Sequence, residues 1–388
     1  MSAIKDQFLL DPDVVFLNHG SFGATPRSVL EKYQEWQREL ERQPVRFLSR
    51  DLTGRLAEAR HILANHVHAQ AEDLVYIPNV TFGVNMVARS LALGPGDEIL
   101  ASDHAYGACD KIWEFVCRKT GASYLRQPIS LPVASPDAVV EQFWQGVTPR
   151  TRVIFVSHIT SPTALRLPVE VICRRAREAG ILTLIDGAHA PGQIPLDLEA
   201  IGADFYTGNC HKWLLSPKGA GFLHVRRERQ GLVEPLVVSW GWEGDPVLKT
   251  GSAFFDSLQW VGTDDPAAYL SVPAALQFQA EHDWPAVVQG CHALVRQALQ
   301  RISDLTRLAP PYPDDVGFYR QMAIAPLPPI ADLAGFQARL YDEQRVEIPL
   351  IQWKEHQFVR VSVQGYNDQA DIDALLRALA LLLPQVTA

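Results

Sequence analysis

Apolar positions along the chain repeat with two periods, one typical of helices and one typical of buried strands. Helical spacing predicts an amphipathic helix over about 52–68, built on Leu52, Leu56, Ala59, Ile62, Leu63 and Val67. Short β-branched runs predict strands at 75–77, 98–102, 123–126, 152–158 and 181–186, with helices between them at 81–91, 107–119, 136–146 and 168–179. Strands separated by helices of roughly 10 to 15 residues are typical of βαβ crossovers, so we predict an α/β fold with a mostly parallel, doubly wound sheet.

The pattern changes at about residue 264. Beyond it the predicted elements are helices at 264–281 and 285–303, proline-rich segments at 310–313 and 326–329, a strand at 358–363 and a helix at 368–383. We therefore predict a large domain over 21–263 and a smaller α+β domain over 264–388, with residues 1–20 as an arm that packs on the small domain.

Composition is typical of a packed globular protein. With 388 residues, 47% of them hydrophobic and 20% charged, the chain is neither disordered nor a collagen or long coiled coil. The net charge of −9 argues against nucleic-acid or anionic-membrane binding. No apolar run approaches the roughly 18 residues that span a bilayer, and the N-terminus lacks the apolar core of a signal peptide. Five widely spaced cysteines without a C-x-x-C pair indicate a reducing, cytoplasmic compartment.

The histidines do not predict a metal site. His61, His66 and His68 lie on one predicted helix but are spaced by five and two positions. They therefore do not share a face as i, i+4 metal ligands would.

Polar side chains follow the predicted strands at their carboxyl ends, where doubly wound sheets bind ligands. The densest cluster is Asp186 at the end of a buried strand, with Lys212 26 positions later in a glycine-flanked irregular segment. A buried carboxylate needs a charged partner, and a desolvated lysine can act as an amine nucleophile toward a carbonyl. Pyridoxal phosphate catalysis uses both, because the lysine binds the aldehyde and the carboxylate keeps the pyridine nitrogen protonated. Residues 79–81 begin the predicted 81–91 helix and supply a helix N-terminus for the phosphate.

Each of these signals alone has a simpler interpretation. An aspartate at a strand end is most often a turn or helix-cap residue, and a lone lysine is most often a solvated surface charge. His211 is compatible with an ordinary loop histidine. The combination in this order on an alternating strand–helix pattern favours the cofactor site.

Three motifs resemble those of a known family. They are D-G-A-H at 186–189, H-K-W at 211–213 and F-L-N-H-G-S-F-G-A-T-P at 16–26. Together they resemble the class V aminotransferase family of fold-type I pyridoxal-phosphate enzymes, and within it the isopenicillin N epimerase-like branch, a relative of the cysteine desulfurases. The resemblance extends from Phe16 to Asn367. It implies the fold-type I architecture, pyridoxal 5'-phosphate as the cofactor, an amino acid as the substrate and a homodimer.

The resemblance also implies roles for individual residues. Lys212 would bind the cofactor as a Schiff base and act as the catalytic base, Asp186 would pair with the pyridinium nitrogen, and His189 would contact the phenolic oxygen. His104 would stack on the pyridine ring, with Tyr106 close enough to compete for that role. The phosphate would be bound by Val80, Thr81, Asn209 and His211.

Further residues would contact the substrate or a second subunit. Arg360 matches the arginine that binds the substrate α-carboxylate through a bidentate pair, with a surface ion pair as its simpler interpretation. Asn18 and His19 would lie on the substrate side of the site. Thr263, after Gly262, would reach the phosphate in the neighbouring subunit.

One departure concerns the nucleophilic cysteine of the cysteine desulfurases. The stretch 345–358, RVEIPLIQWKEHQF, contains no cysteine ahead of Arg360, so persulfide formation by that route is not expected. Cys210, near Lys212 in sequence, is better explained as a buried small side chain than as a sulfur acceptor.

Three reactions share the removal of the α-proton by Lys212 as their first half. Reprotonation on the opposite face gives epimerisation, loss of a β-substituent gives a C–S lyase, and reprotonation on the cofactor gives transamination. Epimerisation needs a second acid, for which His104, Tyr106 and His19 are the candidates.

A catalytically inactive binding protein on the same fold is disfavoured because the lysine, aspartate and arginine are all intact. A dinucleotide dehydrogenase is disfavoured because no G-x-G-x-x-G follows the first strand.

Overall fold

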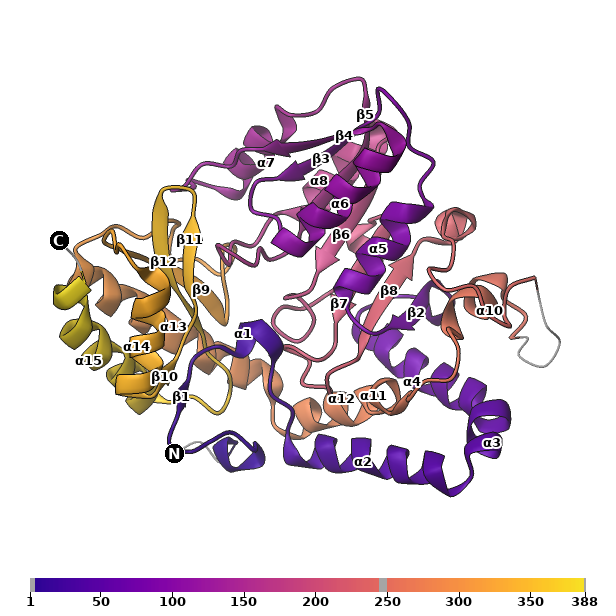
Figure 1. Ribbon diagram of the computed structural model, residues 1–388, viewed down its shortest axis with the longest axis horizontal. Helices are drawn as coiled ribbons and strands as arrows, with labels where there is room; N and C mark the ends of the chain where they lie inside the picture. The colour runs from indigo at the N-terminus through magenta and orange to yellow at the C-terminus, as the bar shows by residue number, and fades with distance from the viewer. Residues whose placement is uncertain (1–3, 244–249, 387–388) are drawn as a thin grey trace.

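Seven strands form the central sheet of the computed structural model, which describes residues 4–243 and 250–386 (Figure 1). Their order across the sheet is β2 (Leu74–Ile77), β8 (Gly221–Val225), β7 (Phe205–Asn209), β6 (Leu182–Gly187), β5 (Thr151–Ser157), β3 (Glu98–Ser102) and β4 (Ser123–Gln127). Within this sheet only β8 runs antiparallel to its neighbours β2 and β7. The predicted mostly parallel α/β sheet is confirmed.

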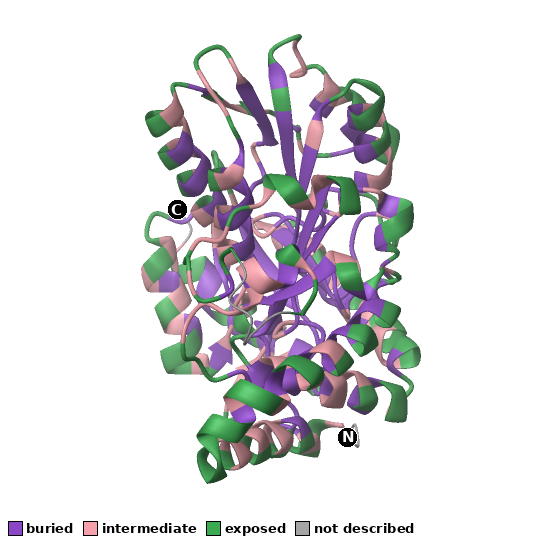
Figure 2. Cartoon of the chain, turned by 90° about the vertical axis from the view of Figure 1, so that its right-hand side faces the viewer, coloured by how far each residue is buried: buried purple, intermediate pink, exposed green. Residues whose placement is uncertain are grey.

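Strand side chains alternate between two hydrophobic cores, one on each face of the sheet. Ile99 and Leu184 belong to one core, whereas the adjacent Leu100 and Ile185 belong to the other. The first core includes α5 (Val80–Ser90), α6 (Gly107–Thr120) and α10 (Ala253–Gln259), and the second includes α4 (Leu52–His66), α7 (Pro136–Trp144), α8 (Val169–Glu178) and α9 (Leu198–Ile201). Figure 2 shows buried residues concentrated in the strands, and exposed residues along the outer helices. Burial on both faces explains why the parallel strands read as continuous apolar runs.

A second, three-stranded antiparallel sheet lies toward the C-terminus. Its order is β11 (Leu350–Trp353), β12 (His356–Ser362) and β9 (Met322–Leu327). It packs with α13 (Trp284–Thr306) and α14 (Leu333–Gln344), and α15 (Gln369–Val386) packs on these two helices. Near the N-terminus, β1 (Val15–Phe16) pairs in parallel with β10 (Val346–Glu347), and Asn18 bridges to Ser362. Residues close to the N-terminus therefore lie against the C-terminal part, while the domain boundaries stay a prediction.

Several segments differ from the helices expected from the sequence. The single helix predicted at 264–281 is wrong, because the chain forms α11 (Ala267–Leu270) and α12 (Val272–Glu281), which carries Pro273 in its first turn. Proline fits a first turn but breaks a helix interior, so a new helix begins there. The long helix α2 (Arg27–Arg42) was not predicted at all, and neither were α10 and α14. The remaining short helices are η1 (Lys5–Gln7), α1 (His19–Phe22), α3 (Pro44–Arg46), η2 (Phe47–Asp51), η3 (Ala71–Asp73) and η4 (Arg227–Leu232).

Among residues 4–243 and 250–386, no helix combines the length and apolarity needed to cross a bilayer.

Candidate active site

A cavity of about 510 Å³ opens at the carboxyl ends of the parallel strands. Its walls come from the segments that follow β2, β3, β5, β6 and β7, and from α1, β11 and β12. Nine of the predicted site residues line it: Val80, Thr81, Tyr106, Asp186, His189, Asn209, His211, Lys212 and Arg360. The fold thus brings together residues from five separate stretches of sequence.

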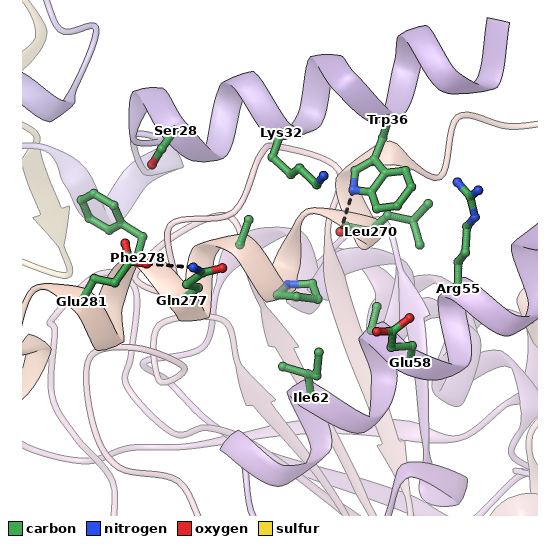
Figure 3. A pocket seen from close by; sticks show the side chains of 13 residues that line it. Ser28, Lys32, Trp36, Arg55, Glu58, Ile62, Leu270, Gln277, Phe278 and Glu281 are labelled. Atoms are coloured by element: carbon green, nitrogen blue, oxygen red, sulfur yellow. Dashed lines mark hydrogen bonds between the residues drawn. The ribbon is translucent and has the colours of Figure 1, made fainter. Parts of the chain in front are cut away.

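A second cavity, of about 490 Å³, lies between α2, α4 and α12 (Figure 3). Lys32, Trp36 and Arg55 are among its lining residues, and the Trp36 indole N–H donates to the Leu270 carbonyl at 3.0 Å. None of the predicted site residues lines this cavity. The predicted site residues therefore line the cavity at the carboxyl ends of the strands and not this second cavity.

The lysine amine lies deep in the cavity at the sheet edge. Lys212 follows β7 in a non-repetitive segment, and its Nζ lies 3.3 Å from His189 Nε2. Burial and then the charge of Arg360 lower the pKa of Lys212 to about 8, against the opposing effect of Asp186. At pH 7 roughly a tenth of this amine is therefore unprotonated, far more than for an ordinary lysine, and the unprotonated form is the one that a nucleophile or a base requires.

A buried carboxylate faces the same cavity. Asp186 lies at the end of β6, where its Oδ1 accepts from the Ala188 backbone N–H at 2.9 Å and its Oδ2 lies 3.8 Å from Cys109 Sγ. Burial raises the pKa of Asp186, while the Ala188 N–H and the charge of Lys212 lower it. Within the described part of the chain Asp186 forms no ion pair, so a cationic group in the cavity would find an unpaired acid.

His189 connects the lysine to the wall behind it. The Trp213 indole N–H donates to His189 Nδ1 at 3.3 Å, and the Gln193 amide donates to the His189 carbonyl at 2.7 Å. Burial, followed by the charge of Lys212, lowers the pKa of His189 well below its usual range. The imidazole is therefore neutral.

The N-terminus of α5 forms one end of the cavity. The Asn79 side chain caps this helix by accepting from the Phe82 N–H at 3.0 Å, and the Val80 N–H donates to Asn209 Oδ1 at 3.0 Å. Thr81 brings its hydroxyl to the same end. Backbone N–H groups and the helix dipole together make this end attractive to an anion such as a phosphate.

Lys218 is a cationic residue of the cavity that was not predicted from the sequence. Lys218 lines the cavity, and its Nζ donates to the Gly23 carbonyl at 3.0 Å. Gly23 has a φ of 72°, and a Cβ there would lie 2.1 Å from the His211 carbonyl oxygen, so only glycine fits. The P-K-G triplet at 217–219 could have directed attention to this position.

The buried guanidinium of Arg360 points into the cavity from β12. Its Nη1 donates to the Ser161 carbonyl at 2.6 Å, and its Nη2 donates to Ser21 Oγ at 3.1 Å. Its Nε is buried without a partner, and no acidic residue of the described chain forms an ion pair with it. Burial lowers the pKa of Arg360 to about 10, so it is still a cation at neutral pH. Sequence reasoning found the arginine but neither serine.

The family profile for class-V aminotransferases matches residues 15–314. The chain belongs to the class V aminotransferase family. It is 38% identical to isopenicillin N epimerase of Amycolatopsis lactamdurans, over 97% of this chain and 96% of that one. It is 36% identical to isopenicillin N epimerase of Streptomyces clavuligerus, over 97% of each. It is also 30% identical to a probable chloroplastic L-cysteine desulfhydrase of Arabidopsis thaliana, over 69% of this chain and 58% of that one.

Solved structures support the same assignment. A C-DES variant with glycine covalently linked to the pyridoxal-phosphate cofactor superimposes with a TM-score of 0.79 at 25% identity, over 97% of this chain and 98% of that one. A cysteine desulfurase from Thermococcus onnurineus NA1 shares the fold, with a TM-score of 0.81 at 18% identity over 99% and 98% of the two chains. This class V protein is therefore a fold-type I enzyme that depends on pyridoxal phosphate.

The side chains of this class V enzyme fit that cofactor. A carboxylate without a cation matches the protonated pyridine nitrogen, and the α5 N-terminus matches the phosphate. Lys212, with its lowered pKa, matches the aldehyde. Tyr106 is 47% exposed and lines the cavity, so it can cover the ring.

His104 does not reach the cavity of this class V enzyme, contrary to the expectation that it stacks on the ring. Its side chain is fully buried, with Nδ1 2.7 Å from Thr163 Oγ1 and Nε2 2.8 Å from the Ile129 carbonyl. Its ring packs on Trp353, with centroids 4.4 Å apart. Because His104 does not line the cavity and both of its nitrogens are hydrogen-bonded inside the protein, Tyr106, which does line the cavity, is the better candidate for contact with a ligand.

His19 and Asn18 also lie in the wall rather than on the cavity surface. His19 is buried, with Nε2 3.1 Å from the Lys212 carbonyl and Nδ1 3.0 Å from the Tyr366 hydroxyl. Asn18 donates to Glu347 at 2.9 Å and accepts from Ser21 at 2.5 Å. Neither residue lines the cavity in this structure, and both form hydrogen bonds within its wall, so their contact with substrate stays a prediction.

Thr263 is exposed and does not line the cavity of its own chain. In the described residues no group of three or more histidines, cysteines, aspartates or glutamates could hold a metal ion.

Proposed function

We propose that this enzyme removes the α-proton of an amino acid and returns it on the opposite face, as an epimerase. The observation that carries the proposal is Arg360, a buried cation without an acidic partner that lines the same cavity as the Lys212 amine. A buried guanidinium is stabilised by a carboxylate that it can bind bidentately, and the α-carboxylate of an amino acid is such a group. The arginine would hold the substrate with its α-carbon close to the lysine.

The side chains divide the work in this proposal. Lys212, whose pKa is lowered to about 8, takes the α-proton. Bound pyridoxal phosphate supplies the electron sink for the electrons that the proton leaves behind. Asp186 would pair with the ring nitrogen of the cofactor, and the α5 N-terminus with Thr81 would bind its phosphate. Of the three candidates for the second acid, only Tyr106 lines the cavity.

The region of β11 and β12 argues against a persulfide-forming desulfurase. Pro349 and Ile351 of this region line the cavity, and no cysteine lies between 345 and 358. The relatives named isopenicillin N epimerase also favour epimerisation, because they are 38% and 36% identical to this chain, whereas the plant desulfhydrase is 30% identical. A C–S β-lyase is the second candidate because that plant relative is named for such a reaction.

We also propose a homodimer in which the exposed Thr263 reaches the phosphate end of the partner's cavity. Five cysteines without disulfides support a reducing, cytoplasmic compartment.

The test is the set of products formed from a panel of L-amino acids, L-cysteine and isopenicillin N. We expect epimerised product, with no stoichiometric release of ammonia, pyruvate or sulfide and no keto acid. Lys212→Ala should abolish turnover and leave the far-UV circular dichroism unchanged, because Lys212 acts through its amine rather than through packing. Lys111→Ala, on the exposed face of α6, is the matched control and should retain full activity.

Release of sulfide from L-cysteine without epimerisation of any substrate would replace the epimerase by the lyase. Turnover by Lys212→Ala at the wild-type rate would overturn the assignment of the base.

A further inference from the structure

Trp213 is linked to the side chain of Lys212 through the side chain of His189. The indole is fully buried, packs against the His19 ring with centroids 4.9 Å apart, and has a single N–H. That N–H donates to His189 Nδ1 at 3.3 Å, while His189 Nε2 lies 3.3 Å from Lys212 Nζ. The three polar groups therefore form a chain from the protein interior into the cavity.

The indole nitrogen is a donor and never an acceptor, and this determines the proton on the imidazole. Because Nδ1 accepts from Trp213, it carries no hydrogen, and the neutral ring carries its hydrogen on Nε2. An Nε2–H can only donate to the lysine nitrogen, and only the unprotonated amine has a lone pair to accept. If Lys212 were protonated, an N–H of its ammonium group would face the Nε2–H of His189, and neither would have an acceptor.

We propose that Trp213 is a positioning residue that sets the tautomer of His189 and, through it, favours the unprotonated form of the Lys212 amine. The inference rests on the proposed role of Lys212 as the base. The alternative tautomer, with hydrogen on Nδ1, would bring two N–H groups face to face at Trp213 and leave both without an acceptor. A protonated His189 would also carry a hydrogen on Nδ1, so it too would place two N–H groups face to face at Trp213.

Nearby charged groups both raise and lower the pKa of Lys212, and these groups are the same whether or not the indole of Trp213 is present. The groups that act on Lys212 are Arg360 from β12, which lowers its pKa, and Asp186 from β6 and Cys109 from α6, which raise it. The groups that act on His189 are Lys212, Arg360, His19 and His211, and each lowers its pKa. A comparison of variants at Trp213 therefore isolates the hydrogen-bond chain from this background.

The first measurement is ¹⁵N NMR of the protein labelled at histidine, recorded at neutral pH with and without bound pyridoxal phosphate. His189→Gln identifies the His189 resonances by their loss. We expect Nδ1 with the chemical shift of an unprotonated acceptor and Nε2 with that of an N–H. A protonated Nδ1 in the wild-type protein would overturn the proposal, whatever reaction the enzyme catalyses.

The second measurement is the pH dependence of the rate at which cofactor-free protein captures pyridoxal phosphate, followed by the absorbance of the bound cofactor. Trp213→Phe keeps an aromatic ring but removes the N–H. We expect the midpoint of the rate profile to move up by about one pH unit, and capture below both midpoints to be about 10-fold slower. An unchanged midpoint would overturn the proposal.

A double substitution separates this role from packing. The glutamine of His189→Gln has no tautomer to set, so adding Trp213→Phe to it should leave the midpoint where His189→Gln alone places it. An equal shift in both backgrounds would show that Trp213 acts by packing. A protein that captures no cofactor at all would overturn the proposed function, and the NMR result would still report on the tautomer.

Discussion

At the scale of single residues, Asp186 and Arg360 each bring a buried charge to the cavity without an ion-pair partner among the described residues. Burying an unpaired charge destabilises a fold by several kcal/mol, unless a bound ligand of opposite charge offsets the loss. Both residues are therefore best explained by the groups that enter the cavity. Substitutions at these two positions test that explanation.

Arg360→Lys keeps the positive charge but loses the planar fork that binds a carboxylate bidentately. We expect amino acids to bind more weakly by about 1.5–3 kcal/mol, the range for a hydrogen bond to a charged group. The cofactor absorbance should hardly change, and amines that lack a carboxylate should show no loss. Arg296→Lys, in an exposed ion pair with Asp314, is the control and should leave KM unchanged. Equal losses for amines and amino acids would place Arg360 outside the substrate site.

Asp186→Asn replaces the carboxylate by an amide that cannot stabilise a protonated ring nitrogen. Cofactor binding should survive, while kcat should fall by roughly 10²-fold or more, the size typical of losing one electrostatic partner of a transition state. Asp204→Asn is the matched control, because Asp204 is also buried but accepts from the Thr183 N–H at the opposite edge of the sheet. The control should lower stability and spare kcat. Wild-type turnover by Asp186→Asn would contradict the role of the carboxylate.

At the scale of elements, α5 connects the stability of the sheet to the binding of the cofactor. Its N-terminus is capped by Asn79 and lines the cavity, while its apolar side belongs to the core that includes α6. A short turn after β2 thus fixes both the start of the helix and the direction in which its N–H groups point.

Asn79→Ala removes the cap and should lower the free energy of unfolding by about 1 kcal/mol. It should also weaken the binding of pyridoxal phosphate, because the first turn of α5 would no longer be held in place. Ser135→Ala provides the control: Ser135 caps α7 by accepting from the Ala138 N–H at 3.1 Å, away from the cavity. Equilibrium unfolding and cofactor titration of both variants are the measurements. Equal effects on cofactor binding would show that the α5 cap has no special role.

At the scale of the whole molecule, buried neutral histidines make the fold sensitive to acid. Burial lowers the pKa of His19 and of His158 to about 3. Between pH 6.5, the ordinary pKa of histidine, and about pH 3, the unfolded chain therefore binds more protons than the folded one. Stability from these residues is complete above pH 6.5 and is lost as the pH falls toward 3.

His158→Gln should reduce this acid sensitivity. At pH 5 the loss is about 2 kcal/mol for one such histidine, at 1.36 kcal/mol for each pH unit below its unfolded pKa. The measurement is the difference in unfolding free energy between pH 7.5 and pH 5, which should be about 2 kcal/mol smaller in the variant. His61→Gln, on the exposed side of α4, should leave the difference unchanged. The same difference in all three proteins would rule out His158 as a source of acid sensitivity.

Much of the architecture and of the central chemistry could be predicted from the sequence, because both are encoded locally. The period of apolar positions predicted five of the seven strands of the central sheet and the helices between them, but not β7 or β8, and short motifs predicted Asp186, His189 and Lys212. The prediction failed where a local pattern was ambiguous, as at 264–281, where a proline begins a new helix inside one continuous apolar stretch. Periodicity counts apolar positions but does not register which backbone N–H groups are missing.

Only the tertiary structure decided which side chains reach the cavity. His104 and Tyr106 are two positions apart after β3, yet the first is enclosed by Thr163 and Ile129 and the second enters the cavity. Lys218 and the serines that hold Arg360 likewise owe their place to partners far away in the chain. The direction of a side chain in a loop depends on contacts between distant segments, and no local pattern in the sequence carries that information.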